Sequence, residues 1–382
     1  MYRQLWIEID LRALRKNLDI IRAIVGEKVK VMAVVKQEAY GHGLVMVARE
    51  LSLKGIDFFG VGSLEEAIVL RKAGIKEPIL VLTVIMPQFV EEVIRYRVTP
   101  ILVDGNFAYR LNQKAKAKEI KVPVHIKIDT GMGRIGVWYK NAYQFIEEIS
   151  SLKYISLQGL CTHFPSADTD RDFTNHQINV FNDLISKLKY KGIEFKYIHC
   201  ANSCGILNYP NAHFNLVRPG IILYGVKPAN LDIDVKPVLS LKSRIVFIKR
   251  VKKGQSVSYG RTFIASKPCY IATVSIGYAD GYPWNLSNKG KVIISHRLFD
   301  IVGRVCMDHI MVNLGDVSSI RVGEEVIIIG REKDIRVSAE DIALWSGTIP
   351  YEVLTRLSLK IPRFYKYSSQ EKKSAYPHND KK

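Results

Sequence analysis

Residues 33–43 (AVVKQEAYGHG) place a lysine, Lys36, at the end of an apolar, strand-like run. A lysine amine that has lost its proton can bond covalently to an aldehyde. The usual pKa of a lysine is about 10.4, and burial lowers it and so favours the uncharged amine. Gly41 and Gly43 follow, and glycine lets the backbone turn sharply after the lysine. A lysine at a strand end can also contact phosphate or remain solvated, so this residue alone leaves three kinds of chemistry open.

A second candidate cluster joins His199 with Cys200 and Cys204. Zinc sites space their ligands differently, so we interpret these cysteines as buried thiols near a strand end. The chain has 5 cysteines, an odd number, and no CxxC pair. This usage favours a reducing cytoplasm over a disulfide framework, and we expect no metal site.

The elements that must position these residues are short apolar runs that alternate with amphipathic stretches. Eight such runs precede residue 225, a pattern typical of repeated β/α units around a parallel sheet. The runs end at Lys36, near Phe58, and at Thr83, Asp104, Asp129, His163, Cys200 and Arg218. Eight strands close a (β/α)8 TIM barrel, whose active site lies at the carboxyl ends of the strands. We therefore predict an α/β fold with this barrel in residues 11–230.

The remaining chain has a different pattern. Leu11, Leu14, Leu18 and Ile21 recur at helical spacing, so they predict the first helix packed on the barrel wall. From about residue 238 the pattern is of strands without intervening helices, which predicts a separate C-terminal, mostly-β domain of residues 231–365. The strand-like residues 1–10 are expected to join that domain. Residues 366–382 are polar and charged, so they are predicted to form a disordered tail.

Charge and hydropathy limit the classes of partner. Lys and Arg number 56 against 37 Asp and Glu, a net charge of +19, but the basic residues are spread along the chain without a nucleic-acid motif. We expect weak, nonspecific nucleic-acid binding at most. The longest apolar run, around residues 78–87, is far shorter than the roughly 20 residues that span a bilayer. No secretion signal is recognised either, so we expect a cytoplasmic protein without a membrane segment.

The segment around Lys36 resembles the pyridoxal-phosphate (PLP) lysine signature of the alanine racemase family. Further motifs match that family in order over nearly the entire chain. These are IKIDTGMGRIG (126–136), GLCTHFPSAD (159–168), HCANS (199–203), VRPGIILYG (217–225), SVSYGRTF (256–263), SIGYADGYP (275–283), GRVCMDHIMV (303–312) and GTIPYEVLTRL (347–357). The resemblance implies a PLP-dependent racemase with a barrel and a β domain, the architecture that the pattern predicts independently.

Racemisation requires a proton to leave one face of a carbon and another to arrive on the opposite face, which two fixed bases accomplish most simply. The resemblance implies that Lys36, which carries PLP as a Schiff base, is one base and Tyr278 the other. In this family the tyrosine reaches the active site of the partner subunit, so a homodimer with shared sites is implied. His163 is its implied neighbour, because a tyrosine with a pKa near about 10 needs a supporting network to act as a base.

The resemblance also implies a set of cofactor contacts. Arg218 would face the pyridine nitrogen, and because arginine only donates hydrogen bonds, that nitrogen would remain an unprotonated acceptor. This favours restrained carbanion chemistry over transamination. Arg134 would contact the phenolic oxygen of PLP and the substrate carboxylate. The phosphate would be held by Tyr40, Ser203, Gly220, Ile221 and Tyr351.

Some implied roles concern substrate and fine tuning. Met307 would offer its backbone amide to the substrate carboxylate, and Lys127 matches a lysine that some members carboxylate. Asp168, Tyr282 and Arg304 resemble residues that line the access passage. The family usually has alanine and then aspartate or asparagine after the PLP lysine, whereas this chain has Gln37 and Glu38.

The function implied is interconversion of L-alanine and D-alanine, which supplies D-alanine for peptidoglycan. Tyr351 would crowd the substrate side chain, which favours a methyl group. A racemase of another small amino acid such as serine, with the same residues in the same roles, is the main alternative. A non-catalytic PLP-binding protein that uses only the barrel is a second alternative, which the presence of Tyr278 and the whole β domain disfavours.

Overall fold

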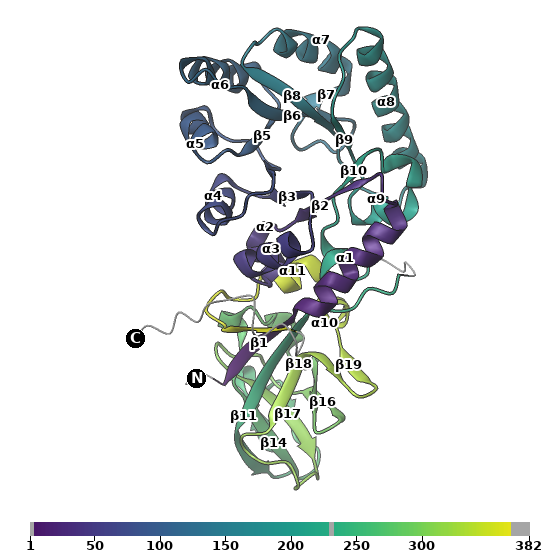
Figure 1. The fold of residues 1–382 in the computed structure, drawn as a ribbon. Coiled ribbons are helices and arrows are strands. Elements are labelled where there is room, and N and C mark those ends of the chain that lie inside the picture. Colours follow the sequence, from purple (N-terminus) through teal and green to yellow (C-terminus); the bar gives the residue numbers. More distant parts are fainter. Residues whose placement is uncertain (1–3, 229–232, 368–382) are drawn as a thin grey trace.

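The computed structural model describes residues 4–228 and 233–367, and within them eight parallel strands form a nearly closed barrel (Figure 1). Their order around the barrel is β10, β2, β3, β4, β5, β6, β8 and β9. The strands are β2 (Lys30–Val34), β3 (Phe58–Val61), β4 (Ile79–Val81), β5 (Thr99–Leu102), β6 (Val122–Asp129), β8 (Ile155–Cys161), β9 (Tyr197–His199) and β10 (Leu216–Val217). The predicted (β/α)8 barrel is therefore confirmed.

Large side chains fill the inside of the barrel, as they must in a closed parallel sheet. One buried cluster contains Met32, Phe58, Leu80, Ile101, Tyr197 and Leu216, which come from six different strands. Because parallel strands are buried on both faces, their sequences are continuous apolar runs, which explains why they can be recognised from sequence.

The gap between β9 and β10 is bridged by a side chain. Asn215 accepts a hydrogen bond from the backbone N–H of Ile198 at 2.7 Å and donates one to the carbonyl of Lys196 at 2.9 Å. Further along, the N–H of Arg218 donates to the carbonyl of Ala201 at 2.9 Å. These bonds hold the last two strand ends together and bring the residues that follow them to one rim.

Helix α1 (Leu11–Val25) buries the predicted face of Leu11, Leu14, Leu18 and Ile21, and the Asp10 carboxylate caps its first turn. The other helices of the barrel domain are α2 (Lys36–Gly41), α3 (Leu44–Leu53), α4 (Leu64–Lys72), α5 (Val90–Arg95), α6 (Gly105–Ala117), α7 (Tyr139–Ser150), α8 (Arg171–Tyr190) and α9 (Ser203–Asn208). Short 3-10 turns η1 (Pro87–Phe89), η2 (Pro210–Ala212) and η3 (Ile221–Tyr224) and the two-residue strand β7 (Val137–Trp138) complete it.

The second sheet is mostly antiparallel and has the order β19, β18, β15, β16, β17, β14, β11, β1 and β20, with an added pairing of β18 to β11. Its strands are β1 (Leu5–Asp10), β11 (Leu239–Val251), β14 (Cys269–Val274), β15 (Lys291–Ile294), β16 (Arg297–Ile301), β17 (Ile310–Gly315), β18 (Glu325–Glu332), β19 (Ile335–Val337) and β20 (Arg363–Lys366). A small hairpin, β12 (Ser256–Val257) with β13 (Phe263–Ile264), and the 3-10 turns η4 (Tyr259–Arg261), η5 (Tyr278–Asp280) and η6 (Trp284–Leu286) lie beside it.

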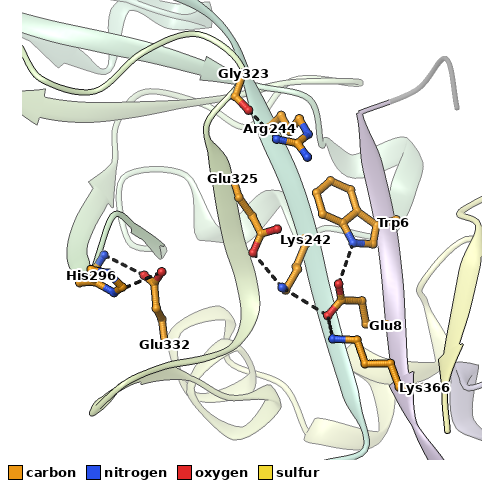
Figure 2. Close-up of polar contacts among 9 residues, drawn as sticks. All are labelled: Trp6, Glu8, Lys242, Arg244, His296, Gly323, Glu325, Glu332 and Lys366. Carbon is orange, nitrogen blue, oxygen red and sulfur yellow. Dashed lines mark hydrogen bonds and ion pairs between the residues drawn. The ribbon is translucent and has the colours of Figure 1, made fainter. Parts of the chain in front are cut away.

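Strand β1 pairs with β11 and β20, so the first strand of the chain lies in this second sheet. Figure 2 shows the ion pairs that accompany the pairing: Glu8 contacts Lys242 at 3.3 Å and Lys366 at 2.6 Å, and Lys242 reaches Glu325 at 2.7 Å. Lys366 was predicted to begin the disordered tail but ends β20, because pairing with β1 and the Glu8 carboxylate order it. Residues 368–382 of the predicted tail lie outside the described residues.

Two helices interrupt the C-terminal region, where the pattern indicates only strands. Helix α10 (Ala339–Ser346) begins at a capping box formed by Ser338 and Asp341, and α11 (Pro350–Thr355) follows it. Helix α11 packs against α2 at the junction of the two domains (Figure 1). Within residues 4–228 and 233–367, no helix combines the length and the apolar character needed to cross a membrane.

Candidate active site

A cavity of about 350 Å³ opens at the carboxyl ends of the barrel strands. Residues from the ends of β2, β6, β8, β9 and β10 line it, together with residues of α11. Lys127 lines the cavity, and so do all nine predicted cofactor contacts. These nine are Lys36, Tyr40, Arg134, His163, Ser203, Arg218, Gly220, Ile221 and Tyr351. The structure therefore brings these residues to one place, although they are spread over more than 300 positions of sequence.

Lys36 follows β2 and extends into this cavity. Burial lowers the pKa of its amine, the nearby Arg134 guanidinium lowers it further, and the Glu66 carboxylate opposes both effects. The amine is thereby shifted toward the uncharged, nucleophilic form that bonds to an aldehyde.

The segment labelled α2, which begins at Lys36, is a left-handed turn and not a right-handed helix. Gln37, Glu38, Ala39 and Tyr40 all have φ between 52° and 54°, so four successive non-glycine residues are left-handed. The sequence interpretation placed the sharp turn at Gly41 and Gly43, which do have positive φ, but the turn begins four residues earlier. The residue types do not indicate this turn, because none of the four has a preference for the left-handed conformation. Such a conformation exists only where surrounding contacts hold it.

Arg218 has one fixed orientation because its buried guanidinium donates to three backbone carbonyls. Its Nη1 donates to the carbonyl of His199 at 2.9 Å, and its Nη2 donates to those of Thr162 at 2.7 Å and Cys200 at 2.9 Å. These carbonyl dipoles replace the water lost on burial. Burial lowers the pKa of Arg218, but arginine stays charged in proteins, so the cavity contains a fixed cation that only donates.

The same guanidinium determines the tautomers of two buried histidines. Nη1 lies 2.5 Å from Nδ1 of His199, and because arginine can only donate, that nitrogen accepts. The proton of His199 is then on Nε2, which donates to Nδ1 of His125 at 2.8 Å. Burial and Arg218 lower the pKa of both imidazoles, so both are neutral. The two-residue alternation of β6 puts His125 on the face of Lys127, a signal that could have identified it from sequence.

His163 approaches Arg218 from β8, with its Nδ1 3.3 Å from Nη2 of the arginine. Burial lowers the pKa of His163 well below its usual value, and the charges of Arg218 and Lys127 lower it further. His163 is therefore a neutral imidazole beside a guanidinium whose two Nη2 hydrogens are already donated to the carbonyls of Thr162 and Cys200.

One end of the cavity fits a phosphate group. The N–H of Gly220 donates to Oγ of Ser203 at 3.0 Å, and an added Cβ on Gly220 would lie 2.7 Å from the Tyr40 hydroxyl. The N–H of Gly220 orients the Ser203 hydroxyl, and the Tyr40 hydroxyl lies next to the same backbone, so two hydroxyl groups meet close to one point, as a phosphate requires. With Lys36 in the same cavity, the donor set fits a phosphorylated aldehyde such as PLP.

Lys127 and Arg134 also line the cavity. Burial, helped by the charges of Arg218 and Arg134, lowers the pKa of Lys127 to about 8. The loop that carries Arg134 is shaped by Asp129, whose carboxylate accepts the N–H groups of Gly131 and Gly133 at 2.9 and 3.0 Å. The Arg134 side chain is exposed in the single chain.

Tyr278 and Met307 are not part of this cavity. Tyr278 is 46% exposed and Met307 55% exposed, and both lie in the second domain. Tyr278 lines a separate hollow with Trp284 and Arg356. Asp168, Tyr282 and Arg304 are also absent from the cavity lining. One chain therefore does not bring the two predicted bases together.

The cysteines near His199 make other contacts. The thiol of Cys200 is buried and donates to the carbonyl of Ala212 at 3.2 Å, and Cys204 is buried as well. Across the part of the chain that the structure describes, no group of three or more His, Cys, Asp or Glu side chains is arranged to hold a metal ion.

The fold and the cavity together define a class of protein: a (β/α)8-barrel enzyme with a half-buried lysine, a fixed arginine and a cradle of hydroxyl and amide groups at its rim. The chain belongs to the alanine racemase family, whose members are PLP-dependent isomerases. The family's N-terminal domain matches residues 9–228 and its C-terminal domain residues 238–365.

Relatives and solved structures agree with this family. The alanine racemase of Halothermothrix orenii is 42% identical over 368 residues, which cover 95% of this chain and 97% of the relative. An alanine racemase structure from Clostridium difficile has a TM-score of 0.90 at 39% identity, with 96% of both chains covered. The Bartonella henselae alanine racemase, with covalently bound pyridoxal phosphate, has a TM-score of 0.86 at 29% identity and covers 95% of this chain and 99% of its own.

Proposed function

We propose that this chain interconverts L-alanine and D-alanine with Lys36 and Tyr278 as two bases on opposite faces of the substrate. The observation that carries the proposal is the cavity in which Lys36, Arg218 and the Ser203–Gly220 cradle meet. Bound there, PLP supplies an electron sink that makes the α-proton of an amino acid acidic enough to remove.

Arg218 would limit how strongly the bound PLP ring withdraws electrons. Its three carbonyl bonds fix the guanidinium, so a ring nitrogen facing it could only accept a hydrogen bond. An unprotonated ring withdraws electrons less strongly than a protonated one, which favours return of the proton to carbon over transamination. Ser203, Gly220, Ile221, Tyr40 and Tyr351 would hold the phosphate.

A second copy of the chain would complete the site. Tyr278 is half exposed and lies outside its own chain's cavity, so Tyr278 of the partner subunit would enter opposite Lys36. There it would meet His163, whose neutral imidazole next to the Arg218 cation would give the tyrosine the polar surroundings that it needs to act as a base. We therefore infer a homodimer with shared active sites.

Lys127, Arg134 and Met307 would together bind and orient the substrate carboxylate. A lysine with a pKa of about 8 presents a sizeable fraction of free amine near neutral pH, which is the form that reacts with carbon dioxide. A carbamate on Lys127 would be an anion beside Arg134 and would hold that guanidinium toward the substrate. Met307 of the partner subunit would add a backbone N–H.

Alanine would be favoured over serine because Tyr351, which lines the cavity, would crowd the substrate side chain. A substrate panel separates the two: we expect kcat/KM for alanine to exceed that for serine, and the reverse order would overturn the alanine assignment. Such an enzyme would supply D-alanine for peptidoglycan. All five cysteines are free thiols and four of them are buried, which supports a reducing, cytoplasmic location.

The direct test replaces Lys36. Purified protein supplied with PLP should form D-alanine from L-alanine and show the visible absorption band of lysine-bound PLP, and a Lys36→Ala variant should lose both. Lys30→Ala is the matched control, because Lys30 lies at the other end of the same strand, in an exposed ion pair with Asp57. If Lys36→Ala keeps the visible band, or if the wild-type protein forms no D-alanine, the proposal is wrong.

A further inference from the structure

The left-handed turn after Lys36 must be held by other parts of the molecule. A left-handed conformation costs roughly 1–2 kcal/mol for each L-residue, and residues 37–40 adopt it four times in succession. Such a conformation persists only where surrounding contacts fix it. Because Lys36 immediately precedes the turn, the contacts that fix its start also fix where the lysine side chain begins.

The carboxylate of Glu66 makes the contact at the start of the turn. Its Oε1 accepts the backbone N–H of Gln37 at 2.5 Å, and its Oε2 accepts the N–H of Gly62 at 2.7 Å. Glu66 lies in the first turn of α4, where Ser63 caps the helix and accepts the N–H of Glu66 at 3.2 Å. One carboxylate thus joins the loop after β3 to the first left-handed residue.

Lys36 packs directly against this bridge. A Cβ added to Gly62 would lie 3.2 Å from Cβ of Lys36 and 3.4 Å from Oε2 of Glu66, so backbone alone fits between the two side chains. The charged groups that face the lysine amine are Glu66 from α4 and Arg134 from the loop after β6, with neutral His163 nearby after β8. Among them, Glu66 is the anion that raises the pKa of Lys36 against burial and Arg134.

The far end of the turn is fixed by different groups. Nδ1 of His42 donates to the carbonyls of Ala39 and Tyr40 at 3.0 and 2.9 Å. From β20, Nε of Arg363 donates to the carbonyl of Gly41 at 2.8 Å, and the Tyr365 hydroxyl donates to that of His42 at 3.2 Å. At the start of the turn the N–H of Ala39 donates to the backbone carbonyl of Val35 at 2.8 Å, and Glu66 supplies the side chain that accepts the N–H of Gln37.

We propose that Glu66 is a positioning residue for Lys36, whose carboxylate fixes the first N–H of the left-handed turn and thereby the direction in which the lysine enters the cavity. The inference rests on the proposed role of Lys36 as the residue that binds PLP. It predicts two separable effects of Glu66, one on the geometry of the lysine and one on its charge.

The charge effect is tested on the full-length chain before PLP is added. Acetylation of Lys36 by acetic anhydride is followed by mass spectrometry across a pH series, and the midpoint reports the pKa of its amine. Glu66→Gln removes the anion that raises this pKa, so the midpoint should move to lower pH by roughly half a unit. Glu65→Gln is the matched control, because Glu65 is the exposed neighbour in the same helical turn, and its midpoint should equal that of the wild type.

The geometric effect is tested on the PLP-loaded enzyme. A glutamine cannot accept with both terminal atoms, so Glu66→Gln should lower kcat about tenfold or more with little change in KM. Glu66→Asp keeps the charge on a shorter side chain, so it should restore the acetylation midpoint but not kcat. An unchanged kcat in Glu66→Gln, or an equal loss of kcat in Glu65→Gln, would overturn the proposal.

A separate measurement checks the premise. Borohydride reduction of the wild-type protein with PLP, followed by peptide mapping, should find the pyridoxyl group on Lys36. Labelling of another lysine would refute the proposed role of Lys36, whatever Glu66 does.

Discussion

Arg218 carries its charge inside the barrel because carbonyl oxygens and a neutral imidazole surround it. A buried cation is stable only where such dipoles replace water, and three carbonyls from the ends of β8 and β9 supply them. His199 and His125 continue the chain of hydrogen bonds toward the barrel interior. At the scale of a residue, the site is organised around one donor that cannot become an acceptor.

The charge of the side chain at position 218 should control whether the enzyme racemises or transaminates its substrate. Arg218→Glu would place an acid where a ring nitrogen is expected, favour a protonated ring, and increase the pyruvate formed by transamination for each racemisation turnover. Arg218→Lys keeps the charge but loses the planar fork, so racemisation should fall about a hundredfold without added pyruvate. Pyruvate is measured by coupled lactate dehydrogenase. An Arg218→Glu variant with the wild-type ratio of pyruvate to D-alanine would contradict this role.

Sequence identifies residues of this kind when their type is restrictive and their motif is specific. Lys36, Arg218 and Ser203 were predicted in this way and do line the cavity. Glu66 and His125 were missed, because a glutamate in the first turn of a helix is ordinarily a favourable charge at the helix end, and a histidine within an apolar strand is ordinarily core. Their roles depend on neighbours that are distant in sequence.

Helix α11 and the turn after Lys36 are in contact, so the second domain influences the catalytic rim. An added Cβ on Gly41 would lie 2.4 Å from the carbonyl oxygen of Leu354 in α11. This backbone approach is possible only for glycine, and it places Tyr351 of the same helix at the edge of the cavity.

Replacement of Gly41 should therefore damage more than backbone conformation. Gly41→Ala should lower the free energy of unfolding by about 3 kcal/mol or more, through strain at a positive φ and the clash with α11. Gly74→Ala is the control, since Gly74 also has a positive φ of 88° but no atom within 4 Å of an added Cβ, and about 1 kcal/mol is expected there. Urea denaturation compares the two. Equal losses would mean that the contact with α11 is unimportant.

The strands and the first helix could be predicted because their apolar patterns depend on local periodicity. The Asn215 bridge between β9 and β10, the left-handed turn and helices α10 and α11 were not predicted. Three of them depend on partners elsewhere in the chain: Asn215 on β9, the turn on Glu66 and β20, and α11 on α2. Helix α10 begins at a capping box of Ser338 and Asp341, a local signal that could have identified it from sequence. Long-range pairing overrides local preference at the other three places.

At the scale of the whole molecule, buried neutral histidines should make stability depend on pH. Burial lowers the pKa of His42 to about 4 and that of His125 to about 3. The unfolded chain binds protons at these residues near pH 6.5, whereas the folded chain does not until far lower pH. Stability is therefore fully present above about pH 6.5 and is lost as the pH falls toward the folded pKa values.

Between about pH 7 and pH 5 the free energy of unfolding should fall by about 2 kcal/mol for each of these histidines. Chemical denaturation at both pH values measures the loss. His42→Asn should reduce this pH dependence, whereas His296→Gln should not, because His296 is an exposed histidine paired with Glu332 (Figure 2). Equal stability of the wild-type protein at the two pH values would contradict the prediction.

The two domains also explain why one chain is expected to be insufficient. The barrel holds Lys36 and the cofactor cradle, whereas the second domain presents Tyr278 away from that cavity. A head-to-tail pair of chains would bring each Tyr278 to the other chain's barrel, and both sites would then be complete.

Mixing two inactive variants tests this account most directly. Lys36→Ala and Tyr278→Phe should each be nearly inactive alone, but a mixed dimer would contain one site with both Lys36 and Tyr278 intact. Equal amounts, dissociated and allowed to pair at random, should recover about a quarter of wild-type D-alanine formation, since half of the dimers are mixed and each has one intact site of two. No recovery above the separate variants would contradict a site shared between subunits.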